Sequence, residues 1–442
     1  MLKVQVQNLR EALQLLEPAV PRKPSVSALT NVRLGEGKAV TTDLEVAITI
    51  SGVGEDGAGE GVCLDYRTLL KLLASVPGYE MATITLEDKK ATLTAGATRA
   101  VLAALPVADY PAIPELKPEH EAAVDGDALV RALAAVLPCA AVGDTRPVLN
   151  TVCLTLGDSP EAAGADGFRL GWQPLPFKLP GEGALLIPTH AVGALLHLWK
   201  KAPKPPELEG MLDPARVATT KRLVRLQYSK DRLAVSFGQV SLITVLIQGT
   251  FPNYRQLIPA EGTSSVSFLA PDLERAARVV LPVVKEGSGI IRLSWAEKQL
   301  RVEGRAEDLG TTTTVISAVC QGEGRIAFNY AYLLEYLKGK EGLVTLEGTG
   351  PSAPGKFSYR GTPHLVMMPM FIKGEGEATP AQATAPEGPA QATAAEEPGE
   401  DEVEPEAPEP PAAEAAPEEE PTPAPEPPGP AKAKARRKKG KA

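Results

Sequence analysis

The stretch TFPNYRQLIP, Thr250–Pro259, lies between an apolar run and what resembles the start of a fresh unit. Its aromatic residues Phe251 and Tyr254 can pack, and Pro252 and Pro259 fix the backbone at both ends. Composition alone favours a structured linker. Because domain junctions are favoured places for ligand sites, the stretch is also a candidate pocket wall. The rest of the chain decides between these two interpretations.

Length and composition predict a globular protein of several domains. The 442 residues suffice for roughly two to four domains, and an apolar content of 43% can build real cores. No apolar run approaches the length of about 18 residues that a membrane span needs, so no membrane partner is expected. The N-terminal segment has polar residues throughout and no small-residue cleavage site, so we expect no signal peptide.

The cysteines predict an intracellular protein without a metal. They are far apart, with no CxxC pair and no histidine pair nearby. We therefore expect reduced thiols in a cytoplasmic protein, no zinc site and no cofactor. The four cysteines are Cys63, Cys139, Cys153 and Cys320.

The net charge of −9 comes from the C-terminal end. From Gly374 onward there are 16 acidic and 7 basic residues, which leaves 39 of each in residues 1–373. Because residues 1–373 carry no net charge, their charge does not by itself indicate a nucleic-acid partner. It permits one only if positive charge gathers on one surface.

One unit occurs three times along the chain. Each copy opens with apolar residues at helical spacing, and each of these helix patterns then meets a proline that limits it. A strand–turn–strand pattern, a second helix pattern and more hairpin sequence follow. The first helix patterns are Leu9–Val20, Asp127–Ala140 and Pro271–Val284, and the second are Asp65–Val76, Thr189–Ala202 and Asn329–Gly339.

This order predicts an α+β fold with three tandem domains, each with two helices packed on antiparallel sheet. The second helix patterns are spaced by a domain-sized step. We place the domains at 1–119, 121–249 and 252–373. Residues 374–442 hold 15 prolines and a single bulky apolar residue, Val403, and are predicted to be a disordered tail. Its basic end is either a solubilising feature or an electrostatic tether.

We find no credible active site, so we do not expect an enzyme. The four histidines lack triad or metal spacing, and no nucleophile elbow or zinc motif is present. Gly350–Lys356, GPSAPGK, matches the first part of a phosphate-binding loop. Phe357 stands where that motif needs Ser or Thr, and a strand pattern follows instead of a helix. A nucleotide-binding enzyme using this loop is an unfavoured alternative.

Basic residues near the helices are candidates for phosphate contacts. Any single one is ordinarily part of a solvated helix face. If the helices of all the units faced a common side, these residues would form a positive lining that binds phosphates without reading bases. The candidates for contact with phosphates, such as those of DNA, are Arg22, Lys23, Arg67, Arg146, Lys200 and Lys201.

Together with the threefold repeat, several motifs resemble those of the bacterial β sliding clamps, the β subunit of DNA polymerase III. The resemblance covers residues 1–373, and no counterpart of the tail occurs in the family's usual pattern. The motifs are TDLEVAI, TRPVLNTV, ADGFRLGW, FPNYRQLIP, FNYAYLLEYL and VMMPM.

The resemblance implies a homodimeric ring, closed head to tail, whose helices line a hole around double-stranded DNA. It implies a non-catalytic processivity factor that a clamp loader places on DNA. Such a factor tethers the replicative polymerase, repair polymerases or ligase through short linear peptides. For ring closure, the resemblance implies that Arg99–Leu105 meets the helix Leu273–Val284 of a second subunit. A monomeric peptide-binding scaffold without DNA is the other alternative.

The resemblance also assigns a peptide pocket between the second and third units, with an apolar groove suited to many peptides. Gln256 replaces a residue that is commonly basic in the family. The pocket residues implied by the motifs are Leu149, Gly167, Phe168, Arg169, Leu170, Pro252, Gln256, Leu257, Asn329, Tyr332, Val366, Met367, Met368, Pro369 and Met370.

Overall fold

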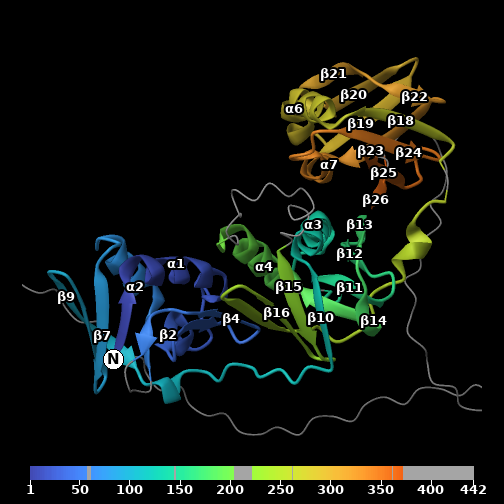
Figure 1. Cartoon of the computed structure of the whole chain (residues 1–442). Helices are drawn as coiled ribbons and strands as arrows, with labels where there is room; N and C mark the ends of the chain where they lie inside the picture. The colour runs from blue at the N-terminus through green and yellow to red at the C-terminus, as the bar shows by residue number, and fades with distance from the viewer. Residues whose placement is uncertain (57–60, 144–145, 204–221, 261, 361, 372–442) are drawn as a thin grey trace, which may run out of the picture. The chain divides into compact units, whose positions relative to one another are not determined.

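The computed structural model describes residues 1–56, 61–143, 146–203, 222–260, 262–360 and 362–371 (Figure 1). The predicted tail, 374–442, lies outside the described residues.

The first repeat, drawn in blue in Figure 1, runs strand, helix, three strands, and then the same series again. A two-residue strand, β5 (Glu55–Asp56), is added at its edge. The elements are β1 (Leu2–Gln5), α1 (Val6–Leu16), β2 (Asn31–Gly35), β3 (Lys38–Thr42), β4 (Val46–Ser51), β6 (Val62–Asp65), α2 (Tyr66–Ala74), β7 (Met81–Glu87), β8 (Lys90–Ala95) and β9 (Thr98–Leu105).

The second repeat follows the same order. Its elements are β10 (His120–Asp125), α3 (Gly126–Val136), β11 (Thr151–Gly157), β12 (Glu161–Ala165), β13 (Arg169–Pro174), β14 (Leu179–Pro188), α4 (Thr189–Lys201), β15 (Leu223–Tyr228), β16 (Arg232–Phe237) and β17 (Val240–Val245).

The third repeat keeps the order with one extra short strand, β22. Its elements are β18 (Ser264–Leu269), α6 (Ala270–Glu286), β19 (Ile290–Ala296), β20 (Gln299–Ala306), β21 (Gly310–Ser317), β22 (Val319–Gln321), β23 (Gly324–Asn329), α7 (Tyr330–Leu337), β24 (Leu343–Gly348), β25 (Gly355–Tyr359) and β26 (Thr362–Met367). The prediction of an α+β fold with three similar units, each with two helices on antiparallel sheet, is confirmed.

Two features of the helices differ from the predictions. Each helix is preceded directly by a strand, such as β1 before α1, which the sequence patterns missed because a four-residue strand merges with the helical spacing that follows. The prolines limit α1 and α3, but α6 continues through Pro282 to Glu286. Pro282 is exposed and lies in the last turns of α6, so water can satisfy the carbonyl group that its missing N–H leaves unbonded.

Side-chain caps fix the starts of α2, α3 and α7. The carboxylate of Asp65 accepts a hydrogen bond from the N–H of Thr68 at 2.8 Å, and Asp125 does the same for Ala128 at 3.1 Å. In α7 the amide oxygen of Asn329 accepts from the N–H of Ala331 at 2.8 Å. Each cap satisfies an N–H group that a helix cannot satisfy by itself.

We expect Asp65→Ala to lower the free energy of unfolding by about 1 kcal/mol, because the first turn of α2 loses its cap. Asp65→Asn is the matched control, since an asparagine cap is about as effective as aspartate. Urea denaturation followed by circular dichroism measures both variants. If both variants lowered the free energy of unfolding by the same amount, the cap would contribute nothing to stability.

Antiparallel ladders join the repeats. Strand β17 of the second repeat pairs with β4 of the first, with Val240 opposite Ile50. Strand β13 of the second repeat pairs with β26 of the third, with Leu170 opposite Val366. The ladders produce sheets of 13, 9 and 4 strands, the first two of which cross repeat boundaries.

The buried apolar residues that the structure describes form three clusters. One apolar cluster fills the first and second repeats, and another fills the third. A third, small cluster lies at the junction of the second and third repeats and includes Leu170, Trp172, Tyr254 and Val366. No helix among the described residues is long and apolar enough to cross a membrane.

Candidate functional site

The stretch Thr250–Pro259 packs against the second repeat. It contains a short 3-10 helix, Tyr254–Leu257, whose Tyr254 is buried and donates its hydroxyl to Glu161 at 2.9 Å. Burial and the neighbouring Glu161 carboxylate raise the pKa of the Tyr254 hydroxyl. Arg255 lies 3.0 Å from the same carboxylate. These contacts anchor the connector and leave Leu257 exposed.

The turn of the ADGFRL motif is built around Asp166. Its carboxylate accepts hydrogen bonds from the N–H groups of Phe168 at 2.8 Å and Arg169 at 2.9 Å. Gly167 has a φ of 93°, a left-handed conformation that favours glycine. This turn holds the ring of Phe168 at the surface, where 59% of the residue is exposed.

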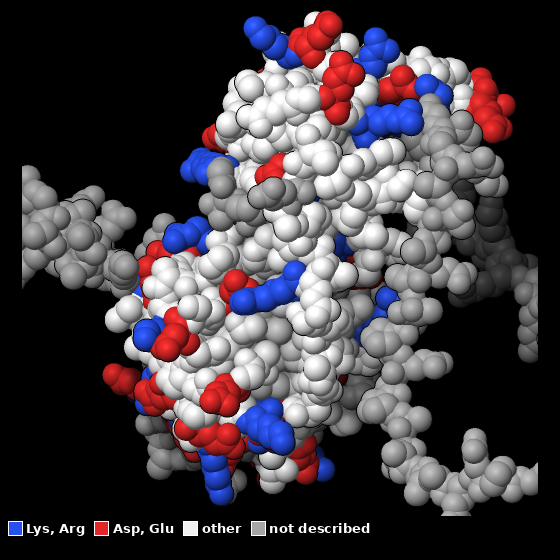
Figure 2. Space-filling model, turned by 90° about the vertical axis from the view of Figure 1, so that its right-hand side faces the viewer, with Lys and Arg blue, Asp and Glu red and all other residues white. Residues whose placement is uncertain are grey.

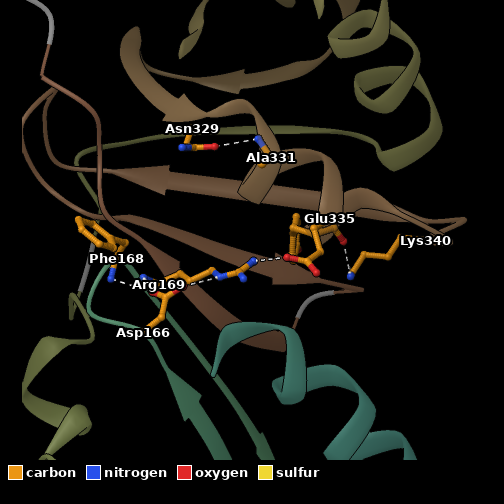
Figure 3. Close-up of polar contacts among 8 residues, drawn as sticks. Asp166, Phe168, Arg169, Asn329, Ala331, Glu335 and Lys340 are labelled. Carbon is orange, nitrogen blue, oxygen red and sulfur yellow. Dashed lines mark hydrogen bonds and ion pairs between the residues drawn. The ribbon is translucent and has the colours of Figure 1, made fainter. Parts of the chain in front are cut away.

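Arg169 connects the second and third repeats (Figure 3). Its guanidinium donates to Asp166 at 3.0 Å and to Glu335 of α7 at 2.6 Å. It also lies over the ring of Tyr332, 4.3 Å from the centroid. Burial opposes the charge of Arg169, but the hydrogen bond to Glu335 and the nearby carboxylates raise the pKa of the guanidinium above its usual value.

Tyr332 of α7, which was predicted for the pocket, is also near this turn. The ring of Tyr332 lies 6.5 Å from that of Phe168, measured between centroids. Burial raises the pKa of the Tyr332 hydroxyl. The side-chain oxygen of Asn329 caps α7, so this oxygen has a structural role as well.

The VMMPM segment joins both repeats. The N–H of Met368 donates to the carbonyl of Phe168 at 2.8 Å, and the N–H of Met370 donates to the carbonyl of Ala327 at 2.8 Å. Met368 exposes 45% of its surface between Met367 and Pro369, both of which are buried.

The structure thus divides the predicted pocket residues into two groups. Leu170, Val366 and Met367 have at most 3% exposure and lie beneath the surface, and their part in lining a peptide pocket stays a prediction. They are buried because the β13–β26 ladder brings them into the junction and third-repeat cores. Pro369 is buried as well. The members at or near the surface are Leu149, Gly167, Phe168, Arg169, Pro252, Gln256, Leu257, Asn329, Tyr332, Met368 and Met370.

Arg146 lies at this site, although the sequence interpretation assigned it to DNA. One terminal nitrogen of its guanidinium would be 3.2 Å from a Cβ atom at Gly167. Its side chain is exposed. The signal that could have placed it is its nearness in sequence to Leu149, since Leu149 donates its N–H to the Arg146 carbonyl at 3.0 Å.

The other candidates for DNA contact are exposed. Arg67 lies on α2, and Lys200 and Lys201 end α4, where Lys201 is 3.9 Å from Glu17. Helices α1–α4 lie on one side of the strands in the first and second repeats (Figure 1), and α4 is close to α1 as well as α3. On the face shown in Figure 2, acidic and basic side chains are interspersed.

The first five residues of the GPSAPGK stretch lie in the turn between β24 and β25, and its last two, Gly355 and Lys356, begin β25. The amine of Lys356 lies 2.9 Å from the Glu347 carboxylate and donates to the carbonyl of Ala260 at 3.4 Å. A nucleotide-binding loop needs a helix N-terminus after the glycines and a lysine free to meet phosphate. Neither condition is met here.

The cavities elsewhere in the described part of the chain include the following two. One of about 540 Å³ lies in the third repeat, beside Trp295, and one of about 1040 Å³ lies between the first and second repeats, beside Phe237. Within the described ranges, no three His, Cys, Asp or Glu side chains gather as a metal-binding group.

Comparison with known proteins agrees with this architecture. No family model matches the chain. A beta sliding clamp of Streptomyces coelicolor is 28% identical over 380 residues, which cover 81% of this chain and 94% of the relative.

Solved structures show the same fold. The DNA polymerase III subunit beta of Pseudomonas aeruginosa matches with a TM-score of 0.74 and 23% identity, over 84% of this chain and 100% of that chain. A sliding clamp of the same organism, solved bound to griselimycin, matches with a TM-score of 0.72 and 22% identity, over 84% of this chain and 99% of that chain.

Proposed function

We propose that this chain, a homologue of the beta sliding clamps, is a DNA polymerase processivity factor. In this function it encircles duplex DNA, slides without reading sequence and holds partner proteins through short peptides. It catalyses no reaction itself. The observation that carries the proposal is similarity along 94% of a beta sliding clamp, combined with the repeated fold of such clamps.

The apolar surface at the junction of the second and third repeats is the proposed peptide site. Phe168, Leu257 and Met368 are exposed there by 59%, 61% and 45%. Exposed aromatic, leucine and methionine side chains form an adaptable surface for peptide anchors. The proposed occupants are peptides of the replicative polymerase, the clamp loader, repair polymerases and ligase.

For DNA we propose contacts from Arg22, Lys23, Arg67, Lys200 and Lys201. All are exposed, and those of α2 and α4 lie on the side where the helices of two repeats gather. Lysine and arginine on such a surface bind phosphates without sequence preference and allow sliding. A DNA-bound protein of this kind works in the cytoplasm of a bacterial cell.

We further propose a homodimer closed through β9 and β21. Strand β21 ends its sheet, and β9 is paired with β6 only through Ala104 and Leu105. Both strands therefore offer backbone groups to a second chain. The expected contact on α6 is limited to its exposed face, because Leu273 and Val284 are fully buried. Two such contacts of β9 with β21 close a ring.

The test is retention on DNA. After loading by the cognate clamp loader with ATP, we expect the protein to stay on nicked circular plasmid through gel filtration. It should leave when a restriction enzyme linearises the plasmid, because a ring slides off an end. Equal retention on both forms would indicate ordinary binding and would refute encirclement. Absence from both forms, while peptide binding persists, would favour the peptide-binding scaffold.

A further inference from the structure

We propose that Glu335 is a positioning residue for the peptide site. Its carboxylate, which comes from the third repeat, fixes the guanidinium of Arg169 from the second repeat. Through Arg169 it sets the distance between Phe168 and Tyr332. This inference rests on the proposed function of the junction surface in peptide binding.

The geometry makes Arg169 a bridge rather than a free recognition group. Its side chain is only 10% exposed, and its guanidinium is bracketed by Asp166 at 3.0 Å, Glu335 at 2.6 Å and the ring of Tyr332. Two of its three guanidinium nitrogens, Nε and one terminal nitrogen, therefore already donate to carboxylates of the protein. A peptide that approaches this surface meets Phe168, which is far more exposed than Arg169.

The two carboxylates on Arg169 differ in what they join. Asp166 is in the same turn as Arg169 and also binds its N–H group, so this pair stabilises the turn within the second repeat. Glu335 lies 166 residues further along the chain and reaches Arg169 from α7. Of these two ion pairs, the one with Glu335 couples the repeats.

Helical spacing extends this coupling to the pocket wall. Tyr332 and Glu335 are three residues apart on α7 and therefore share a face. Both contact the Arg169 guanidinium, the one through its ring and the other through its carboxylate. On the other side, the carbonyl of Phe168 accepts from the N–H of Met368. Arg169 and Glu335 thus connect the elements that present the side chains of Phe168, Tyr332 and Met368.

The experiment measures binding of a fluorescein-labelled peptide with glutamine, leucine and phenylalanine anchors, by fluorescence polarisation. We expect Glu335→Gln to raise the Kd about fivefold, because the ion pair that couples Arg169 to α7 is lost. Glu121→Gln is the matched control. Glu121 is 48% exposed, like Glu335 at 47%, and is paired with an arginine, Arg225, but lies on β10.

A double-mutant cycle separates positioning from direct contact. In an Arg169→Gln background, Glu335→Gln should have no further effect on the Kd, because Glu335 acts through Arg169. An undiminished effect in that background would overturn the inference, as would a Kd for Glu335→Gln equal to that of Glu121→Gln. If the unmodified protein does not bind the probe, the proposed peptide site itself fails, which is a distinct result.

Discussion

Replacing Phe168 with alanine should weaken binding of a peptide with glutamine, leucine and phenylalanine anchors about thirtyfold. Truncating an aromatic hot-spot residue typically costs about 2 kcal/mol or more of binding free energy. Phe168 is suited to this role because 59% of it is exposed at the junction surface, while its backbone is fixed by Asp166 and Met368. Isothermal titration calorimetry measures the change.

Tyr79→Ala is the control for this experiment. Tyr79 is also an exposed aromatic residue, at 76%, but lies in the first repeat. We expect Tyr79→Ala to bind the same anchor peptide with unchanged affinity, and both variants to keep the melting temperature of the unmodified protein. Unchanged affinity in Phe168→Ala would remove this surface from the peptide site.

The second large effect concerns the stability of the proposed dimer ring. We expect the double variant Val101→Lys, Val315→Lys to raise the dimer dissociation constant by at least about a hundredfold. Val101 on β9 and Val315 on β21 are exposed by 57% and 45% on the two strands that we propose to pair. Lysine protects strand edges, and like charges across an interface cost several kcal/mol. The proposed ring contains this contact twice.

Sedimentation velocity over a range of concentrations reports the change as a shift from dimer to monomer. The matched control is Leu223→Lys, which places the same charge on an exposed residue of β15, a strand paired on both sides. A dimer that is as stable in the double variant as in this control would contradict closure through β9 and β21.

The sequence predicted well those features that depend on neighbouring residues. The helix patterns at Asp65 and Asn329 begin at residues that cap the helices in the structure, because an N-cap acts over two or three positions. The repeat order was visible for the same reason, since each hairpin and helix carries its own spacing. These local signals determine the fold class.

Features that depend on distant residues could not be predicted. Nothing near Arg169 in the sequence indicates that Glu335 will bind it, or that β26 will place Met367 in a core instead of on the pocket surface. Arg146 has a basic side chain like the other DNA candidates, and only the folded turn brings it to Gly167. Motif resemblance indicated the proposed peptide site, and packing decides which of the predicted residues are accessible.

The β13–β26 ladder also constrains how the protein matures during synthesis. Arg169 and Met367 are partners in this ladder, so β13 is made long before the strand that completes its sheet. At translation rates of about 5 to 20 residues per second, this delay is roughly 10 to 40 seconds. During that time the nascent second repeat presents an unpaired strand edge, which can attract other chains. The proposed peptide site, built on the same ladder, is therefore among the last parts of the molecule to form.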